Sequence, residues 1–310
     1  MGSKKDVHEK KDYDRRKRIV AVVLIAIILV AAITIVVIFQ QRCGGVLHGN
    51  KYRTRMLEFF GLTDGIDLKF AHAVNSRSKL NKSLTDSNIM ILEADILIDP
   101  LQNIPIMAHP PANSSDLTLV QFLASVFGYA SPKGVKLDFK QIVVVEPSLQ
   151  ILEESKRNHS GRLPPIILNA DILEGPENPS SVPVDAQKFL ALCQKYDSTS
   201  MLSPGWTTRK PTNMSSPEGY SWKMVKDMHS LVKNLQQPVT FPVRASLIAA
   251  SKEQLLWLLG EKESYSLTVW HSNADQYDVK DFVFLRRYPK KVFYDLPEEK
   301  MKRLKQLDHN

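Results

Sequence analysis

The residues whose types and spacing could do chemistry lie in the stretch 89–111, IMILEADILIDPLQNIPIMAHPP. An apolar, β-branched run carries Glu93 and Asp95, and a second apolar run carries His109. Side chains two apart on a strand point to the same face, so we expect the two carboxylates to lie side by side. Two acids on an apolar strand repel each other and lose solvation unless a cation lies between them or one holds a proton. The pair therefore indicates a metal site.

Two further apolar runs end in residues of the same kind. The run KFAHAVN carries His72, and the run KGVKLDFK carries Lys136, Asp138 and Lys140 on one strand face. Either lysine could simply pair with Asp138 inside the protein, because buried charges need partners. Alternatively, Lys140 holds the negative charge that develops on a phosphoryl oxygen.

Together these residues describe metal-assisted cleavage of a phosphodiester. Carboxylate oxygens are hard ligands that suit Mg²⁺ or Ca²⁺, and two histidines beside such a metal can form a general acid–base pair. Each histidine taken alone could equally be a hydrogen-bonded structural residue. The predicted metal ligands are Glu93, Asp95 and Asp138. The predicted catalytic residues are His72, His109 and Lys140.

The elements that must position these residues alternate along the chain. Strand-like runs fall near 66–72, 89–96, 133–139, 165–170, 199–203, 239–243, 265–271 and 291–295. Helical patterns fall near 76–87, 116–127, 146–157, 184–196, 218–234, 251–259, 278–286 and 298–307. This alternation predicts an α/β fold, a (β/α)₈ TIM-type barrel, whose chemistry lies at the carboxyl ends of the strands. An open doubly wound sheet is the alternative, but no Gly-rich phosphate loop follows the first strand.

The barrel interpretation brings further polar and aromatic residues to the same rim. The predicted substrate-binding residues are Asn75, Asn169, Asp171, Trp206, Arg244 and Trp270. Asp171 and Arg244 could equally form salt bridges at the rim, and the two tryptophans could pack in the wall.

Residues 19–39 form an uncharged apolar run of the length that a helix needs to cross a bilayer. A cleavable signal peptide has a shorter apolar region. The sequence RRKR precedes the run and a single Arg42 follows it, so the positive-inside rule predicts a cytoplasmic basic tail over 1–18. We therefore expect a single-pass type II membrane protein with a signal-anchor helix. A stalk and a short helix over 40–63 then lead into a lumenal or extracellular barrel over 64–310.

Composition argues against a nucleic-acid-binding protein. The net charge is +8, but eight of the 41 Lys and Arg lie in residues 1–18, and a binder needs a basic stripe in its folded part. With two cysteines there is no disulfide framework: Cys43 could be acylated or link two chains, and Cys193 is expected to be buried. Glycosylation acceptors, which support an exported domain, occur at Asn81, Asn113, Asn158 and Asn213.

The motifs HAVNS, ILEADI, PIMAHPP, KGVKLDFK, PIILNADIL, LSPGWTT, TFPVRAS and SLTVWH resemble the menorin family, also called the family with sequence similarity 151. The resemblance covers about Asp64–Leu296 and implies one such domain on a membrane anchor. More distantly, the order His, Glu-x-Asp, His, Asp-x-Lys is similar to that of glycerophosphodiester phosphodiesterases and sphingomyelinase D-type phospholipases, which are metal-dependent barrels. That resemblance implies that His72 and His109 act as acid and base. It also implies that a hydroxyl of the substrate attacks the phosphorus.

The chain departs from the phosphodiesterase pattern after both histidines. Ala73 follows His72 where those enzymes have Arg-Gly, and Pro110 follows His109 where they usually have Asp. Two functions remain: a metal-dependent phosphodiesterase of a phospholipid or glycerophosphodiester, or a catalytically silent extracellular domain that binds a protein partner as ligand or co-receptor. Hydrolysis of a sugar substrate by two carboxylates is the weakest hypothesis, because it gives the lysine and the histidines no role.

Overall fold

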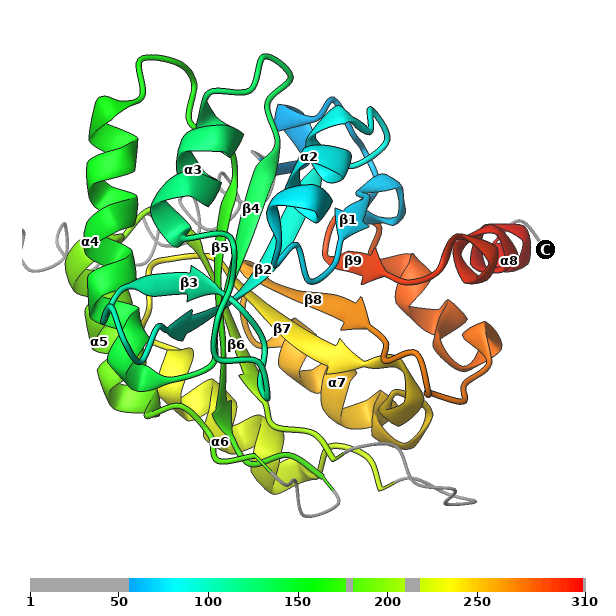
Figure 1. Ribbon diagram of the computed structural model, residues 1–310. Coiled ribbons are helices and arrows are strands. Elements are labelled where there is room, and N and C mark those ends of the chain that lie inside the picture. Colours follow the sequence, from blue (N-terminus) through cyan, green and yellow to red (C-terminus); the bar gives the residue numbers. More distant parts are fainter. Residues whose placement is uncertain (1–55, 177–180, 210–217, 309–310) are drawn as a thin grey trace, which may run out of the picture. The chain divides into compact units, whose positions relative to one another are not determined.

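The computed structural model describes residues 56–176, 181–209 and 218–308, shown as a coloured ribbon in Figure 1. The strands are β1 (Phe70–Ala71), β2 (Ile91–Ile98), β3 (Pro105–Met107), β4 (Gly134–Phe139), β5 (Ile166–Leu173), β6 (Met201–Trp206), β7 (Val239–Arg244), β8 (Tyr265–Trp270) and β9 (Val292–Asp295). The α-helices are α2 (Arg77–Thr85), α3 (Leu119–Phe127), α4 (Ile142–Asn158), α5 (Ala186–Tyr196), α6 (Trp222–Val232), α7 (Lys252–Gly260) and α8 (Glu298–Asp308). The 3₁₀ helices are η1 (Gly65–Asp67), η2 (Ala245–Leu247), η3 (Ala249–Ser251) and η4 (Val279–Arg287).

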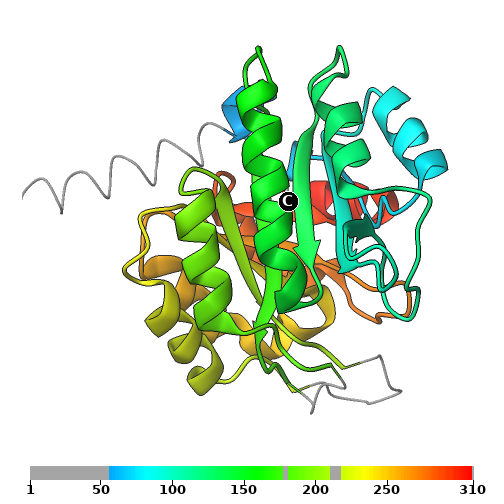
Figure 2. The same ribbon diagram turned by 60° about the vertical axis from the view of Figure 1, so that its left-hand side comes forward.

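The strands form a nearly closed parallel barrel with helices on its outside (Figures 1 and 2). Neighbours follow the order β1-β2-β4-β5-β6-β7-β8-β9, and β3 pairs with β2 in the antiparallel direction. Within the described residues, no strand pairing joins β1 to β9. The predicted α/β barrel is thus confirmed in its parallel strands and outer helices, and the open doubly wound sheet is excluded.

Period-two alternation explains how β4 serves both the core and the site. Val135, Leu137 and Phe139 face outwards and belong to the main hydrophobic core, where Phe139 lies 6.0 Å from the ring of Phe189 on α5. The residues between them, Lys136 and Asp138, are also buried and therefore point into the barrel. One strand thus supplies packing on one side and charge on the other.

Three elements differ from the sequence-based expectation. Strand β1 has only two residues, because Ala73 has φ 52°, a left-handed conformation that does not continue a strand. Strand β3 was not predicted as a paired strand, since three residues are too few to show a periodicity. The predicted helix over 278–286 is the 3₁₀ helix η4, which has non-helical angles at Phe282.

The gap between β1 and β9 is covered by η1, which packs against β9. The backbone N–H of Gly65 donates to the carbonyl oxygen of Pro289 at 2.7 Å. Just before η1, Asp64 pairs with the buried Arg286, which also pairs with Asp308 at 2.9 Å. These contacts tie the start of the barrel to its last strand and helix.

Within residues 56–176, 181–209 and 218–308, no helix is both long and apolar enough to cross a membrane. The predicted tail, membrane span and most of the stalk fall outside this part of the chain, as does Cys43. The short helix predicted before the barrel is described from Met56 to Phe59, and we call it the leading helix.

A side chain at Gly65 should open the barrel at this gap. A Cβ there would clash with the carbonyl oxygen of Val292, which is backbone and cannot move aside. We expect Gly65→Ala to lower the unfolding free energy by about 2 kcal/mol, or roughly 5 °C in Tm, as for overpacking in a core. Gly260→Ala is the matched control, since nothing lies within 4 Å of its Cβ position, and its Tm should stay unchanged. Equal Tm values for the two variants would contradict the close approach of η1 and β9.

Candidate metal centre and active site

The predicted metal ligands lie together inside the barrel. Strands β2 and β4 pair so that Asp95 stands opposite Asp138, while Glu93 stands opposite Lys136. All three carboxylates are buried, and a set of their oxygens, one from each residue, lies within 4.8 Å of one another. The geometry expected from their spacing on the strands is therefore present.

The oxygens of Glu93 show that this cluster fits a cation. Oε2 accepts a hydrogen bond from the backbone N–H of Ala73 at 2.6 Å, whereas Oε1 is buried and has no hydrogen-bond partner within the described chain. Buried polar oxygens normally have a partner, and a cation bound at the cluster would supply the one that Oε1 lacks. An all-oxygen donor set suits Mg²⁺ or Ca²⁺. Burial raises the pKa of Glu93, although His72 and Lys136 oppose the shift.

Lys140 follows β4 and forms ion pairs with two of the predicted ligands. Its Nζ lies 2.8 Å from Asp95 Oδ1 and 2.6 Å from Asp138 Oδ2. Burial alone would lower the pKa of Lys140, but Asp138 and Asp95 raise it well above its usual value. The lysine is therefore a fixed cation. Because an ammonium group has three donors, pairing with these acids leaves one N–H for another acceptor.

Lys136 is a site residue that the predicted set omitted. It is buried inside the barrel and lines the same cavity as Lys140, yet it has no hydrogen bond or ion pair to any residue in the described ranges. Its charge acts on Asp138: burial raises the pKa of that carboxyl, but Lys140 and Lys136 together bring it below its usual range. The sequence signal that could have identified Lys136 is its position two residues before Asp138, which puts both side chains on the same face of the strand.

His72 directly follows the short strand β1 and lies beside two carboxylates. Its Nδ1 lies 3.2 Å from Asp295 Oδ2 and 3.3 Å from Glu93 Oε2. Burial lowers the pKa of His72, but Glu93 and Asp295 outweigh it and raise the pKa to about 9. Because 54% of the side chain is exposed, solvent screens these pairs. Asp295, the last residue of β9, was not predicted, although a carboxylate at the end of a barrel strand marks the functional rim.

His109 returns to the rim because β3 runs back along β2. The pairing of Ile96 with Met107 continues into a hydrogen bond from Ala108 N–H to Asp95 O at 3.0 Å. The next residue is therefore held above the carboxylates, and its Nδ1 lies 2.6 Å from Pro110 O. The ring is exposed, so its other nitrogen is accessible to a ligand.

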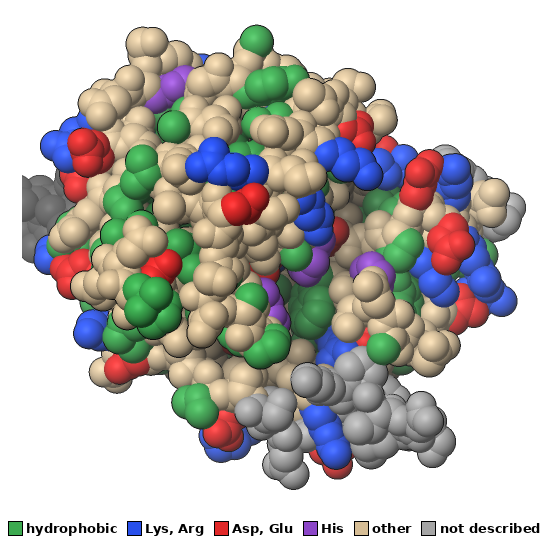
Figure 3. Space-filling view, viewed as in Figure 1, with side chains coloured by type: hydrophobic (Ala, Val, Ile, Leu, Met, Phe, Trp, Pro, Cys, Tyr) green, Lys and Arg blue, Asp and Glu red, His purple; other side chains and the backbone are tan. Residues whose placement is uncertain are grey.

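One cavity of about 370 Å³ at the carboxyl ends of the strands is lined by most of these groups, though not by Glu93 or Asp295. Its charged floor includes His72, Asp95, Lys136, Asp138 and Lys140, and its walls include Phe139, Val182, Val184, Pro242 and Trp270. Figure 3 shows histidine side chains around a hollow on this face. The site therefore combines a charged floor with a partly apolar wall.

The residues predicted to bind substrate fall into two groups. Asn169, Asp171 and Trp270 line the cavity, and Asn169 Nδ2 donates to Asp138 Oδ1 at 2.7 Å. The others lie behind it. Asn75 Nδ2 donates to Asp95 Oδ2 at 2.7 Å, and Arg244 pairs with the buried Asp275. Trp206 is buried in the core with its ring 4.9 Å from that of Tyr220.

The remaining predicted residues are scattered over the surface and core. Asn81, Asn113 and Asn158 are exposed, and Asn213 falls in the undescribed segment 210–217. Cys193 is a buried free cysteine on α5.

Asp171 should make the stability of the metal-free protein depend on pH. Burial and the nearby Asp138 raise the pKa of Asp171 to about 7, from an ordinary value of 3.8. The folded state then binds more protons than the unfolded state between about pH 4 and 7. The unfolding free energy should therefore fall as pH rises through this window, by up to ~1.4 kcal/mol per pH unit.

Asp171→Asn removes this titration and is the test. With a chelator present, the Tm of the variant relative to the unchanged protein should rise steadily between pH 4.5 and 7.5. Asp185→Asn, at the exposed N-cap of α5, serves as a control that should show no such trend. A difference between Asp171→Asn and the unchanged protein that does not vary with pH would contradict the raised pKa.

Comparisons with known families and proteins found matches over most of the barrel. The model of the Menorin N-terminal domain family matches residues 64–301. The human protein named Protein FAM151B is 44% identical over 249 residues, which is 78% of this chain and 87% of that protein.

Two solved structures match this chain with low similarity. One is the GH26 domain of an endo-beta-mannanase/endo-beta-glucanase from Prevotella bryantii, with TM-score 0.43 and 11% identity over 82% of this chain and 93% of that chain. The other is PLC21 of S. officinalis, with TM-score 0.31 and 14% identity over 74% of this chain and 28% of that chain. Neither likeness is close enough to support an argument about mechanism. By its family match and its human relative, the chain belongs to the menorin family.

Proposed function

We propose that this protein is a metal-dependent phosphodiesterase. The observation that carries the proposal is the buried cluster of Glu93, Asp95 and Asp138, in which one Glu93 oxygen has no hydrogen-bond partner in the described chain. Asp95 and Asp138 line a cavity together with two histidines and two lysines. Oxygen ligands favour Mg²⁺ or Ca²⁺, and the surrounding cations favour an anionic substrate. When bound, the metal supplies Lewis-acid polarisation of a phosphoryl oxygen.

The chain's own residues are suited to the proton transfers of this reaction. His72 uses Nδ1 for Asp295 and Glu93, and His109 uses Nδ1 for Pro110 O, so each ring keeps Nε2 for the substrate. One histidine takes the proton of the attacking hydroxyl and the other gives a proton to the leaving oxygen. The remaining N–H of Lys140 and the ammonium group of Lys136, which has no ion-pair partner in the described ranges, stabilise the charge on the phosphoryl group.

The substrate that we propose is a phospholipid or glycerophosphodiester. The charged floor suits a phosphodiester, while Val182 and Trp270 offer apolar surface for the groups attached to it.

We also propose that residues 19–39 anchor the chain as a type II membrane protein, with the barrel lumenal or extracellular. Protease protection in sealed microsomes tests this placement, since digestion of the barrel from the cytosolic side would contradict a lumenal or extracellular one.

Metal binding is the first test. Mg²⁺ or Ca²⁺ at about 1 mM should raise the Tm of the protein by several degrees, because a ligand of the folded state stabilises it. Glu93→Gln keeps the shape of the side chain but removes its charge, so this shift should vanish. Glu253→Gln, on the exposed surface of α7, is the control and should keep the shift. No shift with either ion in the unchanged protein would overturn the metal-dependent function.

Turnover is measured next on a panel of glycerophosphodiesters and lysophospholipids. His109→Gln should lower the hydrolysis rate by about 100-fold or more while leaving the metal-induced Tm shift intact, because it removes a proton-transfer group only. A metal-induced shift without hydrolysis of any phosphodiester would favour the alternative, a catalytically silent domain that binds an extracellular protein.

Removing the charge of Lys136 should strengthen metal binding but slow turnover. Removing a buried positive charge beside the carboxylates reduces repulsion of a divalent cation, so Lys136→Met should tighten metal binding about five- to tenfold. The same change should slow hydrolysis, because a cation for the phosphoryl oxygen is lost. Calorimetric titration with Mg²⁺ or Ca²⁺ measures the first effect and a rate assay the second.

Lys133→Met is the matched control. Lys133 is a buried lysine just before β4, and its Nζ donates to the carbonyls of Asp86 at 2.8 Å and Ile89 at 2.6 Å. Its removal should lower Tm without changing metal affinity. Weaker metal binding by Lys136→Met would contradict the proposed place of its charge.

A further inference from the structure

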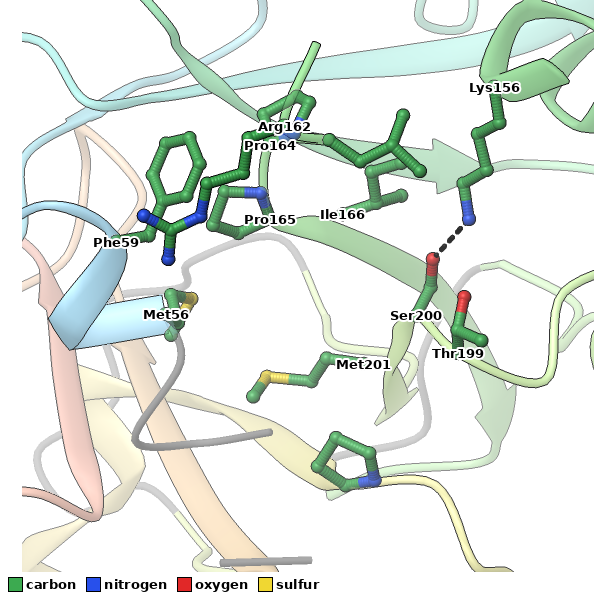
Figure 4. A pocket seen from close by; sticks show the side chains of 12 residues that line it. Met56, Phe59, Lys156, Arg162, Pro164, Pro165, Ile166, Thr199, Ser200 and Met201 are labelled. Atoms are coloured by element: carbon green, nitrogen blue, oxygen red, sulfur yellow. Dashed lines mark hydrogen bonds between the residues drawn. The ribbon is translucent and has the colours of Figure 1, made fainter. Parts of the chain in front are cut away.

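A second pocket, shown in Figure 4, is lined by residues at the starts of strands, whereas the carboxylates lie toward the strands' other ends. It encloses about 520 Å³, within the range of small-molecule sites. Ile166 and Met201 begin β5 and β6, and Pro238 directly precedes β7, so the pocket lies where strands start. The pocket is therefore separate from the site proposed for hydrolysis.

One wall of this pocket comes from the leading helix. Met56 is buried and packs with Leu57 against the first residues of several strands, which plugs this end of the barrel. Met56 and the half-buried Phe59 line one side of the pocket, and Pro165 and Met201 line the other. Apolar side chains, two of them flexible thioethers, thus line both sides, and such surfaces adapt to an alkyl chain.

The pocket offers one available positive charge. Arg162 lies over the ring of Phe59, with its Cζ 4.6 Å from the centroid, and no carboxylate in the described part of the chain pairs with it. The other cation, Lys156, is engaged by Asp197 at 2.5 Å and by the hydroxyl of Ser200 at 3.1 Å. Thr199 also donates to Asp197. Asp197 is therefore already paired, and Arg162 can pair with the anionic group of a ligand.

From this combination we propose that the pocket binds a long-chain fatty acid. The alkyl chain lies between the leading helix and the starts of β5 and β6, where it is removed from water. The carboxylate pairs with the guanidinium of Arg162, whose planar donors match a carboxylate bidentately. The proposal goes beyond the hydrolytic function and does not depend on it, because the two sites lie at opposite ends of the barrel.

The test is photocrosslinking of the full chain in lipid nanodiscs. A fatty acid that carries a diazirine is added, the sample is irradiated, and crosslinked peptides are mapped by mass spectrometry. We expect crosslinks in the peptides that contain 56–59, 162–166 and 199–201. Oleate should compete for them, whereas oleyl alcohol, which has the same tail without a charge, should compete about fivefold less well.

Arg162→Leu should reduce these crosslinks about fivefold, the effect of losing one exposed charge pair. Arg162 is exposed, so the variant is expected to fold, and its metal-induced Tm shift should stay unchanged. Lys226→Leu is the matched control, since Lys226 is another exposed cation over an aromatic ring, that of Trp222. Its crosslinks should match those of the unchanged protein.

Three outcomes would overturn the proposal: no crosslinks in the named peptides, equal crosslinking in Arg162→Leu, or equal competition by oleyl alcohol. None of these outcomes bears on hydrolysis, so the two proposals fail or stand separately.

Discussion

The structure depends on keeping several carboxylates inside one barrel. Burying an ionised acid is costly unless opposite charge lies beside it, and β4 supplies that charge, since Lys136 alternates with Asp138 and is followed by Lys140. The arrangement holds only in one register of β2 against β4. A slip of one residue would turn the acids of β2 into the hydrophobic layer between strands and helices. The positions of the carboxylates in the site therefore depend on the register in which β2 and β4 pair.

The lack of strand pairing between β1 and β9 in the described residues contributes to the same site. Because β1 ends after two residues, the chain turns at Ala73, whose N–H donates to Glu93, and His72 is left facing Asp295 across the gap. A longer β1 would carry this histidine out of reach of β9. The contacts of η1 on the other side of the gap supply the closure that strand pairing does not.

The sequence was sufficient to predict the barrel and much of its rim, because both follow from period-two patterns and the order of elements. It placed Glu93, Asp95 and Asp138 correctly relative to one another. It could not show which rim residues point into the cavity. Trp206 follows a register irregularity between β5 and β6 and packs into the core, and Arg244 has a buried partner, Asp275, thirty-one residues along the chain. Such facts depend on long-range packing, which a local pattern does not contain.

The departures from the phosphodiesterase pattern fall beside the histidines and not on the strands that carry the carboxylates. The three carboxylates stand on β2 and β4, whose register is fixed by the core, whereas His72 follows a two-residue strand and His109 lies on the turn after β3. Ala73 contacts Glu93 through its backbone N–H, a donor that any residue except proline offers. Changes of side chain beside the histidines can therefore alter proton transfer and substrate fit while the carboxylates keep their geometry. For this reason the proposed metal binding and the proposed turnover are separable.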